Sequence, residues 1–447
     1  MSVIEKHDEI EAYFHNVGKP RERWRVGTEY EKVGIVRQTG QAIPYFGPRG
    51  VDRILRELIE RFHWEPEEQD GNIIALSRDK AQITLEPGGQ IELSGEPCES
   101  IHCTYAEFSQ HIRELIEVCE PMGIIFLGLG MQPISRLDQI EWVPKKRYRI
   151  MGPYMPTVGK LGQRMMKQTA TVQANIDFLD EKDAMMKFRT GMGLAPILIA
   201  MFANSPICDG QLNGYRSFRE HIWTDTDKSR QGLLKFAFEP GATFAHYVEY
   251  ALDVPMYFII RHHDYINMTG RTFRQYLQYG HNGERATLED WADHLTTLFP
   301  ETRIKRYIEI RSVDSQPPEL MPALSALVKG AFYDNDCLQA AWDLVKGWSW
   351  DERMEVYLDS HVNALASRFR RFSLLDLSKE FFEIAWEGLR RQNVVNDLGD
   401  DETVYLKPLK NLLDQGKCPA DLLLDRWEGE LKQDIKKLIA YSAYKLP

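Results

Sequence analysis

Two glutamates interrupt a strongly strand-forming segment near the start of the chain. In WRVGTEYEKVGIV (24–36), Glu29 and Glu31 are separated by a single residue. Because successive side chains of a strand point to opposite faces, the two carboxylates share one face and lie about 6.5 to 7 Å apart. That spacing suits two cations held around one polyphosphate. On this segment alone, a solvated edge strand is the better explanation.

Three further segments repeat this arrangement of polar groups opposite an apolar face. TLEPGGQIELSG (84–95) has a glutamate on each side of a Pro-Gly-Gly break, whose glycines let the backbone approach a ligand or a neighbouring strand. TATVQANIDF (169–178) and RYIEIRSVD (306–314) alternate polar and apolar residues. The polar positions that could do chemistry are Glu86, Glu92, Gln173, Asn175, Glu309 and Arg311. Four such strands predict one sheet whose polar face lines a wet cavity.

The five glutamates of these strands predict a metal site. Gathered in one cavity, they would repel one another unless cations neutralised them. Oxygen ligands without histidine or cysteine select Mg²⁺, Mn²⁺ or Ca²⁺ rather than zinc. Arg311 adds a fixed, forked donor for phosphate oxygens.

Two polar segments between the strands are candidate substrate loops. We expect HIWTDTDKSR (221–230) to form a loop that brings Arg219 and Arg230 over the cavity to bind carboxylate or phosphate. PKKRYRIMGPYMP (144–156) combines cations with Tyr148 and Tyr154. It fits a lid or substrate loop, and it fits a basic surface turn equally well.

The composition of the 447-residue chain excludes several classes of protein. Hydrophobic residues make up 43% and charged residues 27%, as in ordinary globular proteins. The formal charge of −11 argues against nucleic-acid binding, because neutralising phosphates needs a basic excess. Apolar runs such as 123–131 are too short to cross a membrane, and the acidic first residues resemble neither a signal nor a transit peptide. We therefore expect a cytosolic protein without nucleic-acid or membrane partners.

The hydrophobic periodicity predicts an α+β fold with a helical C-terminal part. Predicted helices cover 3–15, 49–62, 98–121 and 181–203. Predicted strands cover 23–37, 123–132, 167–178 and 304–312, with two more across 72–95 and others within 233–261, and a loop covers 143–160. From Leu320 onward the pattern is helical, so we expect a catalytic domain over 1–319 and a helical region over 320–447 packed on it.

The motifs GTEYEK, LEPGGQIELSG, MPTVGKLG, TATVQANIDF, HIWTDTDKSR and TRIKRYIEIR resemble, in order and over nearly the whole chain, the plant-type glutamate–cysteine ligases that also occur in proteobacteria. The resemblance implies a glutamine synthetase-like fold, a curved antiparallel sheet forming a bowl with helices behind it. It also implies ATP as co-substrate, two or more Mg²⁺ ions, and small-molecule substrates: glutamate reacts through γ-glutamyl phosphate with the amino group of cysteine, in the first step of glutathione synthesis.

The resemblance also implies roles for individual residues. Metal ligands would be Glu29, Glu31, Glu86, Glu92 and Glu309. Gln173 and Asn175 would lie near the metal and phosphates, and Arg311 would face the transferring phosphoryl group. Arg219 and Arg230 would bind substrate carboxylate or phosphate, with Tyr148, Met151 and Tyr154 in the amino-acid pocket.

The thiols depart from the plant pattern. Plant members form two regulatory disulfides, and this chain has no cysteines at those positions, where Tyr105, Met268 and Met321 stand instead. Cys98 and Cys103 are five residues apart, a spacing that would turn them to different sides of a helix, so we expect no substitute bridge. These departures favour a monomer or weak homodimer.

Two other functions fit the same residues. One is a related carboxylate–amine ligase that takes a different amine. The other is a non-catalytic Mg²⁺- or nucleotide-binding protein that keeps the bowl as a scaffold.

Overall fold

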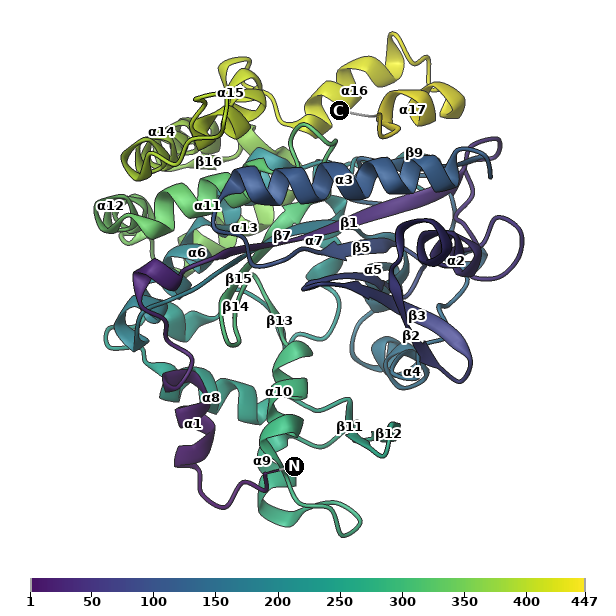
Figure 1. The fold of residues 1–447 in the computed structure, drawn as a ribbon. Helices are drawn as coiled ribbons and strands as arrows, with labels where there is room; N and C mark the ends of the chain where they lie inside the picture. The colour runs from purple at the N-terminus through teal and green to yellow at the C-terminus, as the bar shows by residue number, and fades with distance from the viewer. Residues whose placement is uncertain (1, 446–447) are drawn as a thin grey trace.

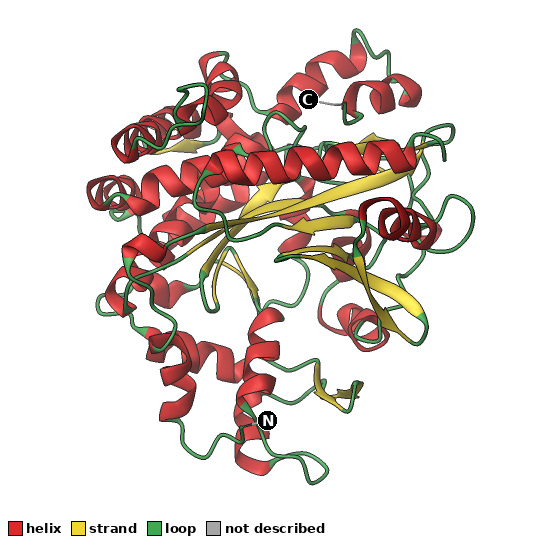
Figure 2. Ribbon diagram, in the orientation of Figure 1, coloured by secondary structure: helices red, strands yellow, loops and turns green. Residues whose placement is uncertain are grey.

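The computed structural model describes residues 2–445, and its centre is a nine-stranded antiparallel sheet (Figures 1 and 2). The strand order is β14 (Thr302–Ile304), β15 (Ile308–Asp314), β7 (Thr171–Ile176), β1 (Val26–Val36), β5 (Ile91–Ser94), β4 (Ala81–Leu85), β3 (Asn72–Arg78) and β2 (Glu65–Gln69), with β6 (Ile124–Leu127) also paired to β1. The predicted α+β fold, with an antiparallel sheet backed by helices, is confirmed.

Helices cover one face of the sheet, so the side chains that do not contact these helices point to the opposite face. Figure 1 shows α3 (Ile101–Cys119) running along β1. Tyr30 packs on Phe108 of α3 with ring centroids 4.6 Å apart, and the Thr28 hydroxyl lies 2.6 Å from that of Ser325 on α11 (Ala323–Tyr333). The even-numbered residues of this part of β1 therefore face the helices. Alternation sends Glu29 and Glu31 to the opposite face.

Helix α6 (Glu181–Phe202) is the central core helix. It packs against β15, α12 (Asn335–Val345), α13 (Trp350–Asn363) and α14 (Leu374–Gln392). Within residues 2–445 it alone is long and apolar enough to cross a membrane, but 89% of its most apolar window is buried inside the protein. Its apolar character is thus that of a core helix.

The remaining elements form two outer groups (Figure 1). Below the sheet in this view lie α1 (Asp8–His15), α8 (Phe244–Asp253), α9 (Phe273–Tyr279), α10 (Leu288–Thr296) and the hairpin of β11 (Phe258–Arg261) and β12 (Asp264–Asn267). At the C-terminal end lie α15 (Lys407–Asp414), α16 (Pro419–Glu428) and α17 (Ile435–Ser442). A further helix, α2 (Val51–Phe62), packs on α3 and β3. The proposed division at residues 319 and 320 remains a prediction.

Three predicted elements are wrong. The supposed loop 143–160 contains α4 (Tyr148–Val158), which forms despite Pro153 and Pro156 because its apolar side chains recur at helical spacing and are buried. The segment 233–261 holds only one strand, β11, and its longest element is α8, which buries positions spaced three and four apart and begins at a Thr243 cap. The segment 72–95 holds three strands rather than two.

The expectation that Cys98 and Cys103 stay unpaired is also wrong, because the two form a disulfide. Helix α3 begins only at Ile101, with Ser100 as its N-cap. Cys98 therefore precedes the helix, in an extended segment hydrogen-bonded to Val26, and helical spacing does not apply to the pair. The chain turn at Ser100 brings the two Cα atoms to 5.8 Å.

Candidate active site

A cavity of about 480 Å³ opens on the sheet face opposite α3 and α11. Most of the residues predicted from the strand pattern line it, namely Glu29, Glu31, Glu86, Glu92, Gln173, Asn175 and Arg311, together with Tyr148 of the 144–156 segment. A smaller cavity of about 80 Å³ adjoins it and shares Glu31, Glu86, Tyr148 and Arg311 with it. The four strands thus bring their polar faces together as expected from alternation.

Three of the carboxylates form a tight cluster, which we call the carboxylate triad: Glu31, Glu86 and Glu92. Glu31 of β1 lies directly across from Glu92 of β5 in the strand register. Glu86 lies in the Pro-Gly-Gly turn between β4 and β5, where a side chain on Gly88 would meet the Lys167 carbonyl at 2.2 Å. One oxygen from each carboxylate lies within 4.8 Å of the other two.

The electrostatics of the triad favour a bound cation. None of the three carboxylates has an ion pair within residues 2–445. Burial, followed by the charges of Glu86 and Glu92, holds the pKa of Glu31 well above its usual value. Burial and Glu86 also raise the pKa of Glu92, although hydroxyl donors at 2.6 and 2.8 Å partly oppose the shift. Buried oxygens that repel one another in this way fit Mg²⁺ as a ligand set.

Glu29 is held by amides rather than by cations. It accepts hydrogen bonds from the Gln173 Nε2 at 2.8 Å and the Asn175 Nδ2 at 2.9 Å, both on the neighbouring strand β7. Burial, then the charges of Glu309 and Glu92, raises the pKa of Glu29 to about 7. These contacts fix the carboxylate at the cavity wall, next to the triad.

Glu309 lies behind the cavity wall, next to lining residues Arg303, Lys305 and Arg311, and its role as a metal ligand stays a prediction. Its side chain is fully buried and pairs with Arg303, with Lys305 at 2.5 Å and with Arg311 at 3.4 Å. Although burial opposes the shift, these three cations hold the pKa of Glu309 well below its usual range. In the metal-free protein these three cations, rather than a metal ion, neutralise the Glu309 carboxylate.

The predicted arginines divide between the cavity and the core. Arg311 donates to the Gln173 Oε1 and presents its guanidinium to both cavities. Arg219 lines the smaller cavity and is paired with Glu220.

Arg230 lines neither cavity, and its role as a substrate ligand stays a prediction. It is buried against Asp227, the Thr297 carbonyl and the ring of Tyr257. Tyr154 lines neither cavity and donates to the same Asp227 at 3.2 Å. Both side chains therefore donate hydrogen bonds to Asp227 in this structure.

The amino-acid pocket predicted from the 144–156 segment is partly reproduced. Tyr148 lines both cavities and donates to the Leu85 carbonyl at 3.0 Å, while Met151 lines the smaller one. Sequence reasoning missed Arg147, Arg303 and Lys305, which also line the larger cavity. For the last two, the alternation in TRIKRYIEIR was the available signal, because Arg303 lies directly opposite Glu309 in the β14–β15 register.

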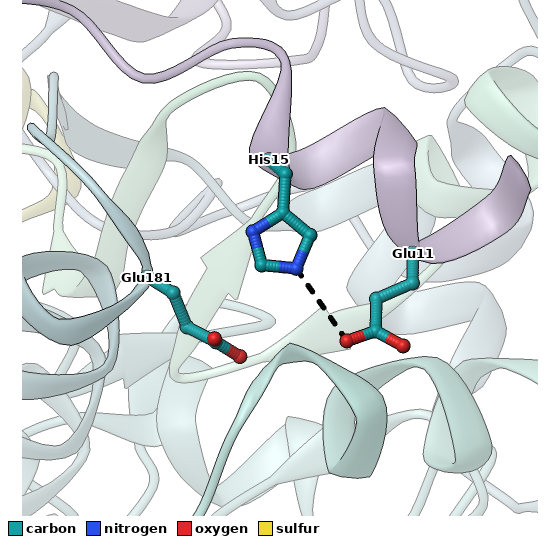
Figure 3. Close-up of side chains that lie close together, drawn as sticks. All are labelled: Glu11, His15 and Glu181. Carbon is teal, nitrogen blue, oxygen red and sulfur yellow. Dashed lines mark hydrogen bonds and ion pairs between the residues drawn. The ribbon is translucent and has the colours of Figure 1, made fainter. Parts of the chain in front are cut away.

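A second group of acidic side chains lines neither cavity and is more exposed than the triad. Figure 3 shows Glu11 and His15 of α1 beside Glu181 of α6. His15 and Glu11 are 3.5 Å apart and substantially exposed, and Glu181 accepts the Phe244 backbone N–H. Solvent and local hydrogen bonds satisfy these groups.

Three comparisons with known proteins agree with one another. The sequence model of "Glutamate-cysteine ligase family 2 (GCS2)" matches residues 25–438. The chloroplastic glutamate–cysteine ligase B of Oryza sativa subsp. japonica is 43% identical over 432 residues, covering 96% of this chain and 85% of that protein. The Arabidopsis thaliana chloroplastic glutamate–cysteine ligase is 43% identical over 431 residues, covering 96% of this chain and 81% of that protein. A crystal structure of a Francisella tularensis glutamate–cysteine ligase in complex with AMP superposes with a TM-score of 0.56 at 14% identity, over 95% of this chain and 90% of that one.

Proposed function

The chain belongs to glutamate-cysteine ligase family 2, and on that premise we propose that it joins the γ-carboxylate of L-glutamate to the amino group of L-cysteine at the expense of ATP. The products are γ-glutamylcysteine, ADP and phosphate. This is the first step of glutathione synthesis. The observation that carries the proposal is the unpaired carboxylate triad in a cavity that also presents arginines, on the four strands that hold the family motifs.

We propose that Mg²⁺ is held by Glu31, Glu86 and Glu92, with Glu29 beside them. Bound there, Mg²⁺ would neutralise the charge of the phosphate oxygens during phosphoryl transfer. The fit rests on the chemistry of the donors, which are all oxygens, buried in Glu31 and Glu92 and half-buried in Glu86, and which have no direct ion pair in the described chain. The use of ATP agrees with the AMP complex of the structurally similar ligase.

The chain's own residues would position the reactants. Arg311 and Arg303 present guanidinium groups to the larger cavity, and both are oriented by the same buried Glu309. Donors fixed in advance stabilise developing negative charge without reorganising during the reaction. Gln173 bridges Arg311 and Glu29, so it couples the orientation of the phosphate-binding side to that of the carboxylate side. The residue roles within the site remain proposals.

Product analysis tests the function directly. The purified protein is incubated with Mg²⁺, ATP and glutamate plus a panel of amines, and ADP release and the ligated product are measured. We expect ADP and γ-glutamylcysteine with cysteine present. Stronger turnover with another amine would instead indicate a related carboxylate–amine ligase, and no ADP with any combination would indicate a non-catalytic binding protein.

The cytosolic location and the state as monomer or weak homodimer also remain proposals. Cell fractionation tests the first. Analytical ultracentrifugation over a range of concentrations tests the second, with a sedimentation coefficient of the single chain expected at low concentration.

A further inference from the structure

The basic segment 145–149, where α4 begins, contains four cations, and three of them already have partners. Lys145 donates to the Leu85 carbonyl at 2.9 Å. Lys146 pairs with Asp70 and Asp264, and Arg149 pairs with Asp70 at the surface. Of the four cations, only Arg147 has no such partner among the described residues.

Arg147 is an unpaired guanidinium between the two cavities. It lines both of them, and its buried Nε has no hydrogen-bond partner. Within residues 2–445 its side chain has no ion pair, and it lies over the Tyr148 ring at 5.5 Å. A buried cationic donor without a partner is costly, so the arrangement indicates that an anion completes it.

The other cavity arginines differ from Arg147 in this respect. Among the described residues that line either cavity, each of the remaining guanidinium groups pairs with a carboxylate: Arg25 with Glu99, Arg219 with Glu220, and both Arg303 and Arg311 with Glu309. Arg147 is therefore the arginine available for a bidentate contact with an incoming carboxylate.

The smaller cavity next to Arg147 indicates which anion this is. At about 80 Å³ it is too small for a nucleotide, and Met151, Met165 and Met166 form part of its wall. Polarisable thioethers suit a short, sulfur-containing or aliphatic side chain. A small amino acid placed there would direct its carboxylate to Arg147, and Glu31 and Glu86 would lie nearby in the shared wall.

We infer that Arg147 binds the α-carboxylate of an amino-acid substrate at the junction of the two cavities. The inference rests on the proposed ligase function. Cysteine and glutamate both carry an α-carboxylate that could bind Arg147. The methionine wall favours the carboxylate of cysteine. Arg147 is then a substrate-binding residue that sets specificity for α-amino acids over the corresponding simple amines.

Decarboxylated substrates test this contact. Steady-state kcat/KM is measured for cysteine against 2-aminoethanethiol, and for glutamate against 4-aminobutyrate, in the wild type and in Arg147→Met. The matched control is Arg149→Met, which removes the same charge from the same segment at a surface position. We expect the wild type and the control to prefer cysteine strongly, and Arg147→Met to lose about 10- to 100-fold of that preference. The KM for ATP should stay unchanged.

The alternative outcomes are distinct. If Arg147→Met loses the preference for glutamate over 4-aminobutyrate and keeps the preference for cysteine over 2-aminoethanethiol, Arg147 binds the α-carboxylate of glutamate, and the inference stands. If both preferences survive, or if only the KM for ATP rises, the inference is wrong while the ligase function stands. If the wild type forms no ADP, the proposed function itself fails. Arg147→Lys, which keeps the charge but loses the fork, should give an intermediate preference and covers the case in which Arg147→Met does not fold.

Discussion

The sheet carries two acidic regions that look alike in the sequence and differ in the structure. Glu31, Glu86 and Glu92 lie together without a direct ion pair to any described residue, and burial and mutual repulsion raise the pKa of Glu31 and of Glu92. Glu309, on strand β15 of the same sheet, is enclosed by three cations that lower its pKa. The negative charge of the triad is thus not neutralised by an ion pair in the described chain, whereas three neighbouring cations neutralise the charge of Glu309. The local sequence determines that a carboxylate lies on this face of the sheet, and the side chains packed around it determine whether its charge is neutralised.

The largest expected effect comes from breaking the triad. Glu31→Gln should lower kcat by about 100-fold or more, because a ligand substitution exceeds the 10- to 100-fold loss typical of groups around the ligands. The unfolding temperature of the metal-free variant should be equal to or higher than that of the wild type, since one repelling charge is removed. ADP release and differential scanning calorimetry measure the two quantities. Near-normal kcat would remove Glu31 from the site.

The converse is expected for the paired region. Glu309→Gln leaves Arg303, Lys305 and Arg311 without their buried counter-charge, so the free energy of unfolding should fall by about 3 to 5 kcal/mol. Urea denaturation in the absence of metal measures it. A stability equal to that of the wild type would show that the two acidic regions do not differ as described.

The pH dependence of stability sharpens the comparison. The pKa of Glu29 rises from its ordinary 4.5 to about 7 in the folded protein, so between these values the folded state binds more protons than the unfolded state. Glu29 should therefore contribute stability to the metal-free protein that is lost as pH rises from 4.5 to 7, while the buried His294 and His361, whose pKa burial lowers to about 3, act with the opposite sign below pH 6.5. Lys32, whose pKa burial lowers to about 7, acts with the opposite sign only above this window.

Two further melting curves isolate this contribution to the slope. Glu29→Gln should remove it, leaving the contribution of groups such as Glu107, whose pKa is also raised to about 7 by burial. Added Mg²⁺ should stabilise the wild type more at pH 7 than at pH 5, because metal binding competes with protons. Equal slopes in the wild type and in Glu29→Gln would contradict the assignment of the slope to this carboxylate.

The smallest effect is expected at the disulfide, which lies outside both acidic regions. Cys98 and Cys103 enclose a loop of only six residues, so Cys103→Ser should lower the free energy of unfolding by about 2 kcal/mol or less. Urea denaturation with and without a reducing agent measures the change. A reducing agent should destabilise the wild type and leave Cys103→Ser unaffected.

The parts of the site that follow from strand alternation could be predicted from the sequence. Side-chain direction in β1 is set by the backbone, so the shared face of Glu29 and Glu31 follows from their spacing alone. The carboxylates of the β4–β5 hairpin needed only the turn at Gly88 and Gly89 in addition.

The parts that depend on distant contacts could not be predicted. Arg230 is held by Thr297 and Pro255, which are 67 and 25 residues away in the chain. The neutralisation of Glu309 depends on the register of β14 against β15. Helix α8 forms in an aromatic, strand-like sequence because tertiary packing overrides propensity. The helical region after Leu320 was predictable because its periodicity extends over many residues.

We propose that the carboxylate triad, with Glu29 beside it, holds the divalent cation. Titration of Mn²⁺, followed by its EPR signal, measures binding to the wild type, to Glu86→Gln and to the control Glu11→Gln from the exposed group in Figure 3. We predict that Glu86→Gln weakens binding by about 10-fold or more and that Glu11→Gln binds as the wild type does. Unchanged binding in Glu86→Gln, or its loss in Glu11→Gln, would contradict the account.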